Sequence, residues 1–155
     1  LKENILKTKE SLSPSELKEK LLSLGFVISD SLGFENIYAI AVARKFAERH
    51  NLTTLSDLQQ LSKTIRLGLA HEFFSRPDGY PHLTKIYGLS IPRENIRLME
   101  HSLLYTAIEN DKVDAIEVYS TDGKIEKLGL VLLKDDRFAF PKYEAVLLVH
   151  KDFVS

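Results

Sequence analysis

The sequence predicts an α/β fold, with a mainly parallel sheet flanked by helices. Short apolar runs alternate along the chain with segments whose apolar residues recur at helical spacing, which is the pattern of strands joined by crossover helices. Of the 155 residues, 44% are hydrophobic and 28% are charged, a balance that is typical of a folded domain with a buried core.

The first predicted helix begins at Pro14. Ser13 and Glu16 have the spacing of a capping box, and proline is favoured in the first helical turn. Gly25 can end this helix, because glycine readily adopts the left-handed conformation that follows a helix. Alternating or continuous apolar residues predict strands at 26–29, 34–42, 64–70, 95–98, 113–118, 128–133 and 145–149.

The later helices follow from similar signals. Thr54 and Asp57 repeat the capping-box spacing before a helix over 54–61, and Gly88 can end a helix over 82–87. Apolar residues of 103–108, Leu103 included, are predicted to share the buried face of a third helix. Shorter helical segments are expected at 45–49 and from Lys124.

Residues 71–81 follow the strand at 64–70 and contain an unusual density of polar and aromatic side chains. They are predicted to form a loop, in which Pro77-Asp78-Gly79 makes a turn that presents Arg76 and Tyr80 on either side. Ligands of open α/β sheets bind at the carboxyl ends of strands, so this loop is a candidate binding segment.

A second polar cluster, residues 119–123, follows the predicted strand at 113–118. Ser120 or Thr121 is expected to cap the helix that begins near Lys124 and to leave free backbone N–H groups beside the same sheet edge. The two clusters should therefore face one crevice.

Composition excludes several classes of function. The chain has 21 basic and 22 acidic residues, so no net field attracts nucleic acid, and a nucleic-acid partner is not expected. The absence of cysteine excludes disulfides and thiolate metal sites, and the histidine spacing indicates no metal site and no cofactor. No apolar run approaches the roughly 18 residues of a membrane span. Because the chain opens on Leu1, it is interpreted as part of a longer protein.

Four segments, GFENIYAIAV, EFFSRPDG, DAIEVYSTDG and FPKYEAV, resemble in order and spacing the substrate-binding proteins of osmoprotectant ABC importers. The resemblance implies one lobe of a periplasmic-binding-protein type II fold, a clamp of two lobes that closes on its ligand without catalysis. It also implies glycine betaine, choline, carnitine or ergothioneine as ligand, and an ABC permease subunit or a fused permease domain as partner. The expected location is the periplasm or the extracytoplasmic face of the cytoplasmic membrane.

The same resemblance implies a division of the chain. Residues 1–31 are expected to be a remnant of the first lobe and the hinge, residues 32–142 the ligand-binding second lobe, and residues 143–155 a truncated crossing back to the first lobe. A fragment of this kind could dimerise through its uncovered first-lobe surfaces.

The chemistry of a quaternary ammonium group fits the residue types in these motifs. Such a group has no N–H donor, so apolar contact and the negative faces of aromatic rings must hold it. An arginine can grip a ligand carboxylate with two parallel hydrogen bonds, and hydroxyl groups can add donors. The expected ligand-binding residues are Tyr38, Glu72, Arg76, Tyr80, Tyr119, Ser120, Thr121 and Tyr143.

Each assignment has a structural alternative. Tyr38 lies in an apolar strand and could be core, and Arg76 could brace the loop by pairing with Asp78 or Glu72. Glu72 could brace Arg76 or face a ligand that carries an N–H donor. Lys142 stands before Tyr143 where the family often has a proline. Tyr87 and Tyr105 sit at core spacing on helices and are assigned to the core.

Two other functions stay open from the sequence. A small hydrolase could use His71, Glu72 and Asp78 as an acid–base cluster, but no nucleophile motif, phosphate loop or metal signature accompanies them. The chain could also be the effector-sensing lobe of a regulator, because the clamp fold serves both uses.

Overall fold

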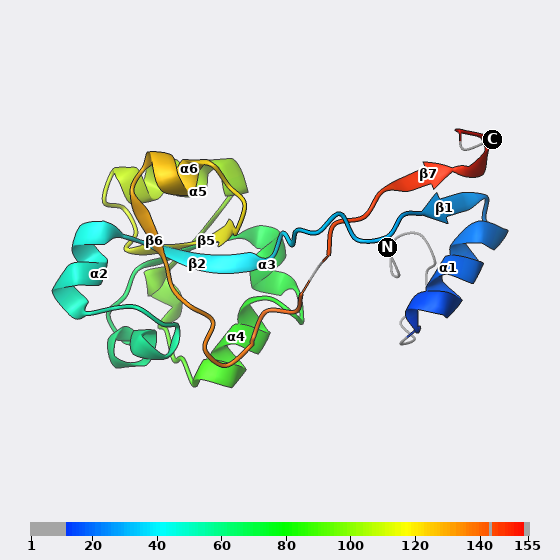
Figure 1. The fold of residues 1–155 in the computed structure, drawn as a ribbon. Coiled ribbons are helices and arrows are strands. Elements are labelled where there is room, and N and C mark those ends of the chain that lie inside the picture. Colours follow the sequence, from blue (N-terminus) through cyan, green and yellow to red (C-terminus); the bar gives the residue numbers. More distant parts are fainter. Residues whose placement is uncertain (1–11, 143, 154–155) are drawn as a thin grey trace. The chain divides into compact units, whose positions relative to one another are not determined.

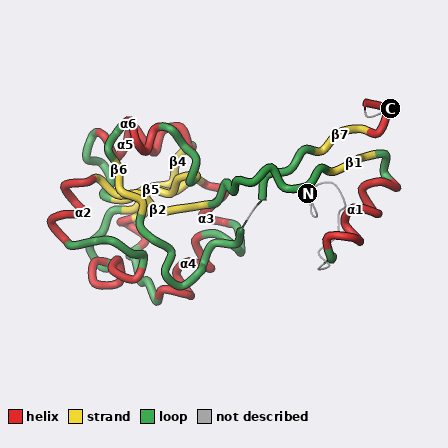
Figure 2. Tube along the Cα trace, in the orientation of Figure 1, coloured by secondary structure: helices red, strands yellow, loops and turns green. Residues whose placement is uncertain are grey.

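The computed structural model describes residues 12–142 and 144–153. The chain divides into two compact units, of which the larger is residues 35–143 and the smaller combines residues 1–34 with residues 144–155. Figure 1 shows the fold, and Figure 2 marks the helices and strands along the trace. The assignment of residues 32–142 to a ligand-binding lobe, with remnants of a first lobe on both sides, stays a prediction.

The smaller unit contains the helix that the capping box predicts. In α1 (Pro14–Ser23), the Ser13 Oγ accepts a hydrogen bond from the Glu16 N–H at 3.3 Å, and the Glu16 carboxylate accepts one from the Ser13 N–H at 2.7 Å. β1 (Phe26–Ile28) pairs antiparallel with β7 (Leu148–His150), and a short 3₁₀ helix follows β7 at Lys151–Phe153.

The larger unit is built on a five-stranded sheet of order β4-β3-β5-β2-β6. β3 pairs in parallel with β4 and β5, whereas β2 pairs antiparallel with both β5 and β6. Four strands therefore run in one direction, which confirms a mainly parallel sheet with β2 as the exception. The strands are β2 (Tyr38–Ala43), β3 (Leu67–Ala70), β4 (Ile96–Met99), β5 (Ala115–Tyr119) and β6 (Leu130–Leu132).

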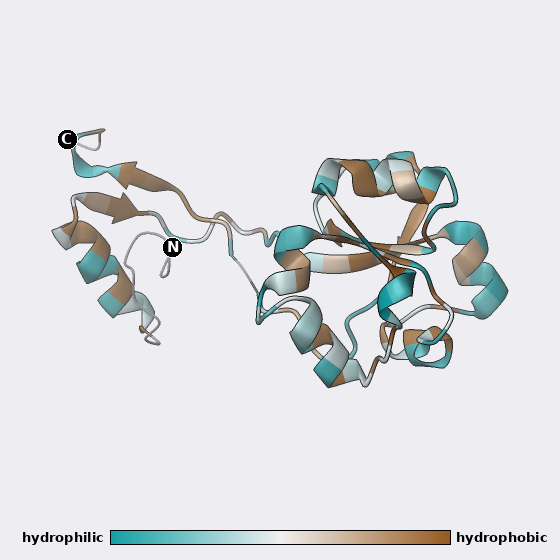
Figure 3. Cartoon of the chain, turned by 180° about the vertical axis from the view of Figure 1, so that it is seen from behind, coloured by the Kyte–Doolittle hydropathy of each residue, from teal (hydrophilic) through white to brown (hydrophobic). Residues whose placement is uncertain are grey.

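Helices cover both faces of this sheet, with α5 and α6 on one side and α4 on the other (Figure 1). Leu104 of α5 shares a buried cluster with Ile116 of β5, and Leu83 of α4 shares the opposite cluster with Ile40 of β2. Figure 3 shows the strands as apolar and the helices as mixed in polarity. The helices of this unit are α2 (Arg44–His50), α3 (His71–Ser75), α4 (Tyr80–Tyr87), α5 (His101–Glu109), α6 (Lys124–Lys127) and the 3₁₀ helices Ser56–Leu61 and Arg93–Asn95.

The prediction that residues 71–81 form a loop is wrong. α3 begins at His71, directly after β3, and α4 begins at Tyr80. Only the turn between them matches the expectation, with the Gly79 N–H donating to the Arg76 carbonyl oxygen at 3.0 Å. Two helices therefore hold most of the side chains of this segment.

Two other helices differ in detail from the sequence pattern. The segment after Thr54 is a 3₁₀ helix from Ser56, and the Asp57 carboxylate accepts hydrogen bonds from the Thr53 and Thr54 N–H groups at 2.9 and 2.7 Å. On α5, Leu103 is 52% exposed, because the buried face is turned toward Tyr105. The predicted burial of Tyr87 and Tyr105 is confirmed.

None of the helices within residues 12–142 and 144–153 has the length and hydropathy that crossing a membrane requires.

Candidate functional site

A cavity of about 250 Å³ lies at the carboxyl ends of β3, β4 and β5 in the larger unit. α3 starts immediately after β3, and α5 starts two residues after β4, so the first turns of both helices reach the cavity. β2 runs antiparallel to β5, which places the start of β2 beside the end of β5. The lining residues are Tyr38, Ala70, His71, Glu72, Phe73, Met99, Glu100, His101, Glu117 and Tyr119.

A row of rings forms one wall of this cavity. The ring centroids are 4.8 Å apart for Phe73 and Tyr38, 5.2 Å for Tyr38 and Tyr119, and 4.7 Å for Tyr119 and His101. Burial is the main cause that holds the pKa of Tyr38 above its usual value, so its phenol stays neutral. We call Phe73, Tyr38, Tyr119 and His101 the aromatic row.

Glu117 is a carboxylate buried at the centre of the sheet. Its side chain is fully buried on β5, and its Oε2 accepts a hydrogen bond from the Ala70 N–H at 2.9 Å. Its Oε1 lies 3.3 Å from His101 Nδ1, an ion-pair distance without hydrogen-bond geometry. Burial raises the pKa of Glu117, which outweighs the opposing effects of the Ala70 N–H and of His101.

His101 lies between two carboxylates. Its Nε2 is 3.2 Å from Asp122 Oδ2, on the side of the ring opposite to the Glu117 contact. Asp122 also accepts hydrogen bonds from the Tyr105 hydroxyl and the Tyr119 N–H. Burial acts to raise the pKa of Asp122, but these hydrogen bonds and the neighbouring His101 outweigh it and the pKa is lowered.

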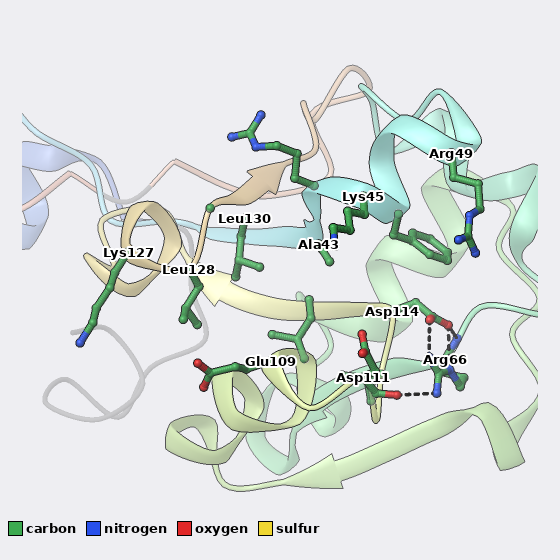
Figure 4. A pocket seen from close by; sticks show the side chains of 15 residues that line it. Ala43, Lys45, Arg49, Arg66, Glu109, Asp111, Asp114, Lys127, Leu128 and Leu130 are labelled. Carbon is green, nitrogen blue, oxygen red and sulfur yellow. Dashed lines mark hydrogen bonds and ion pairs between the residues drawn. The ribbon is translucent and has the colours of Figure 1, made fainter.

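A larger groove, of about 900 Å³, lies at the other edge of the sheet, where β3 and β5 begin (Figure 4). Its lining is dominated by charged side chains such as Lys45, Arg49 and Lys127. Arg66 in this groove is occupied by two hydrogen bonds to the Asp114 carboxylate, at 2.6 and 3.0 Å. The groove has no row of rings, so the smaller cavity is the candidate site for an organic cation.

Residues 12–155 match the OpuAC family, described as the substrate binding domain of ABC-type glycine betaine transport systems. The chain belongs to this family.

Individual relatives agree with the family match. The chain is 38% identical over 127 residues to the carnitine transport binding protein OpuCC of Listeria monocytogenes, which covers 81% of this chain and 41% of that protein. It is 33% identical over 124 residues to the ergothioneine transport permease/ergothioneine binding protein EgtU of Helicobacter pylori, which covers 80% of this chain and 22% of that protein. The chain thus spans less than half the length of these curated relatives.

Solved structures support the fold. A crystal structure of a glycine betaine/carnitine/choline ABC transporter superposes with a TM-score of 0.75 at 32% identity, over 99% of this chain and 57% of that one. The arginine-, lysine-, histidine-binding protein ArtJ of Geobacillus stearothermophilus shares the fold, with a TM-score of 0.50 at 16% identity. The predicted relation to two-lobed binding proteins is confirmed over part of their length. The OpuAC family and these curated relatives are transport proteins, which counts against the hydrolase alternative.

The structure brings together three of the residues predicted to bind ligand. Tyr38, Glu72 and Tyr119 line the cavity, although Tyr38 is also buried and belongs to the core cluster. The core interpretation of Tyr38 is confirmed, and its contact with a ligand stays a prediction, because a ring in the wall of a cavity can pack on one side and face the cavity on the other.

Arg76 does not line the cavity. Its Nε and one terminal nitrogen donate to the two Asp78 carboxylate oxygens at 2.9 and 2.8 Å, and its other terminal nitrogen donates to Glu72 Oε1 at 3.2 Å. Its guanidinium carbon lies 6.0 Å from the Tyr38 ring centroid. In this structure Arg76 therefore braces the turn between α3 and α4, which was the structural alternative. Tyr80 stacks on Phe74 at 5.4 Å, away from the cavity.

Ser120 and Thr121 do not cap α6, which corrects that prediction. The residue before α6 is Gly123, which makes no side-chain capping hydrogen bond. The Ser120 Oγ instead accepts a hydrogen bond from the Ile37 N–H at 3.2 Å, and the Thr121 hydroxyl donates to Asn36 Oδ1 at 2.9 Å. Both side chains tie the segment before β2 to the end of β5. Tyr143 lies outside the described residues.

Sequence reasoning missed Glu117 and His101. The predicted strand at 113–118 gave no role to Glu117, and the histidine spacing indicated no site at His101. A lone carboxylate inside a strand bounded by apolar residues was the available signal for Glu117. Within the described ranges no group of three or more His, Asp or Glu side chains is placed to hold a metal ion.

Proposed function

We propose that this chain carries the ligand-binding cavity of a substrate-binding protein that captures a quaternary ammonium compound and delivers it to an ABC permease. The observation that carries the proposal is the aromatic row beside a cavity at the carboxyl edge of the sheet, in a member of the OpuAC family. Ring faces attract a cation that offers no N–H donor, with a contribution of up to about 2 kcal/mol per ring where water is excluded.

The ligand classes are those named for the relatives. Carnitine, glycine betaine and ergothioneine each carry a trimethylammonium group and a carboxylate, whereas choline carries only the cation. We assign residues 32–142 to the ligand-binding lobe, and residues 1–31 and 143–155 to the first lobe and the crossings. A permease, as a separate subunit or fused to the same chain, on the extracytoplasmic side of the membrane is the partner that this role requires.

Calorimetry with the four compounds tests this function. We expect each of them to bind saturably, at millimolar concentrations or below, without any product being formed. Tyr119→Ala should weaken binding by about tenfold, because it removes a ring from the middle of the aromatic row. Tyr119→Phe keeps the ring and is the matched control. Absence of saturable binding for all four compounds, or equal affinities for Tyr119→Ala and Tyr119→Phe, would contradict the proposal.

Arg76 supplies a sharper test of the carboxylate contact. We propose that a ligand carboxylate competes with Asp78 for the Arg76 guanidinium, since both can form the same pair of parallel hydrogen bonds. Arg76→Lys cannot form this pair, so it should weaken glycine betaine and carnitine binding more than choline binding. Asp78→Asn is the matched variant. It weakens the competing ion pair, so it should strengthen glycine betaine and carnitine binding more than choline binding. Equal losses for all ligands in Arg76→Lys would reduce Arg76 to a structural brace.

A further inference from the structure

Glu117 occupies a position that is costly for a carboxylate. β5 is an inner strand of the sheet, paired with β3 on one side and with β2 on the other. Within the described residues, the fully or nearly fully buried polar side chains are Glu117 and Ser62, and only Glu117 can carry a charge. An ionised group without water needs a compensating charge or several hydrogen bonds.

The two oxygens of Glu117 have different partners. The Oε2 atom accepts a hydrogen bond from the Ala70 N–H at 2.9 Å. The Oε1 atom and His101 Nδ1 are the buried side-chain atoms in residues 12–142 and 144–153 that have no hydrogen-bond partner. Glu117 and His101 both line the candidate cavity, and the 3.3 Å contact between Glu117 Oε1 and His101 Nδ1 is an ion pair only when His101 is protonated.

The other charged and titratable groups near Glu117 leave the site acidic. Glu72 from α3 and Glu100 from the residue before α5 line the same cavity, and Asp122 lies on the far side of His101. His71 and His101 are the basic side chains in the lining. The Arg76 guanidinium nearby is already engaged by Asp78 and Glu72. A cation that enters the cavity therefore meets an excess of carboxylates.

We propose that Glu117 is the counter-charge of the ligand cation, and that capture of the cation is coupled to release of a proton from the Glu117 carboxyl. This inference rests on the proposed function, because it requires that the cavity takes a quaternary ammonium group. The cation stabilises the carboxylate by charge attraction in a site of low dielectric, and the displaced proton passes to solvent.

The direction of the coupling follows from burial. In the empty cavity, burial raises the pKa of Glu117 above the ordinary glutamate value, which favours the neutral carboxyl. A bound cation favours the ionised form and lowers this pKa. Affinity for a cation should therefore increase as the pH rises through the pKa of the empty site, and should level off above it. Binding by the faces of the Phe73, Tyr38 and Tyr119 rings alone has no such dependence.

A pair of isosteric ligands separates charge from shape. Choline and 3,3-dimethylbutan-1-ol have the same outline, but the alcohol has carbon in place of the ammonium nitrogen and is neutral. The 155-residue chain is titrated calorimetrically with each, in two buffers of equal pH and different ionisation enthalpy, between about pH 5 and about pH 8. The difference in heat between the buffers gives the number of protons released. We expect release with choline, none with the alcohol, and choline affinity that increases with pH.

Variants then test whether the released proton comes from Glu117. Glu117→Gln keeps the size of the side chain and the acceptor for the Ala70 N–H, and it should weaken choline binding by about tenfold or more while leaving the alcohol unaffected. Glu94→Gln removes the same charge from an exposed site outside the cavity and is the matched control. The wild-type comparison of the two ligands needs no variant, so it decides the question even where Glu117→Gln does not fold.

The outcomes separate this inference from the proposed function. Choline binding without proton release across the pH range, or equal choline affinity for Glu117→Gln and Glu94→Gln, would overturn the counter-charge and leave the binding function intact. Proton release that persists in Glu117→Gln would also overturn it. A wild-type chain that binds none of the quaternary compounds would overturn both.

Discussion

Phe73→Ala is expected to lower the free energy of unfolding by about 3–5 kcal/mol, the usual cost of deleting a buried phenylalanine. Phe73 is 1% exposed, and its ring lies between those of Tyr38, at 4.8 Å, and Phe140, at 6.0 Å. The deletion removes one end of the aromatic row and leaves a cavity in the core. Tyr38 then loses the support that orients it, so ligand affinity should fall together with stability.

Urea unfolding followed by far-ultraviolet circular dichroism measures this loss, because the chain contains no tryptophan to report by fluorescence. Phe138 is 83% exposed, and Phe138→Ala is the matched control, with an expected change within about 0.5 kcal/mol. If the two variants unfold at the same urea concentration, Phe73 does not support the core in the way described.

Gly79→Ala is expected to destabilise the protein by about 3 kcal/mol, at the upper end of the cost of overpacking. A Cβ on Gly79 would stand 2.2 Å from the carbonyl oxygen of Phe73, a backbone atom that cannot rotate away. The turn between α3 and α4 would have to open, and the Arg76 brace across it would be disturbed. The midpoint of urea unfolding should therefore move to a lower concentration.

Gly123→Ala is the matched control for this substitution. Gly123 has φ −62°, and among the described residues other than its chain neighbours no heavy atom lies within 4 Å of the position where its Cβ would stand. Alanine there should be neutral or stabilising by up to about 1 kcal/mol, through the reduced freedom of the unfolded chain. A smaller loss for Gly79→Ala than for Gly123→Ala would show that the turn adapts.

The sequence predicted those parts of the molecule that depend on near neighbours in the chain. The capping box of Ser13 and Glu16 needs only three residues, and the burial of Tyr87 and Tyr105 follows from helical spacing. The placement of Tyr119 at a polar strand end follows from the order of the motifs. These features could be predicted because each is determined by a local sequence pattern or by the order of the motifs.

The predictions that failed concern contacts between residues that are distant in sequence. The Ser120 hydroxyl was assigned to a nearby helix, but its partner is the Ile37 N–H, 83 residues away in sequence. The Glu117 carboxylate and His101 lie close together because α5 begins at the same sheet edge at which β5 ends. Arg76 shows a different limit, since two carboxylates within four residues compete for it and only coordinates show which contacts form.

Tyr38 is paired with Tyr119 across β2 and β5, so the register of these two strands determines where both phenol rings lie. Side chains alternate between the two faces of a sheet, so a slip of one position in either strand would turn one phenol to the opposite surface. An insertion or deletion of one residue in β2 would thus disrupt the aromatic row even where the fold is preserved. Among homologues, the length of β2 should be constrained more tightly than the identity of its apolar residues.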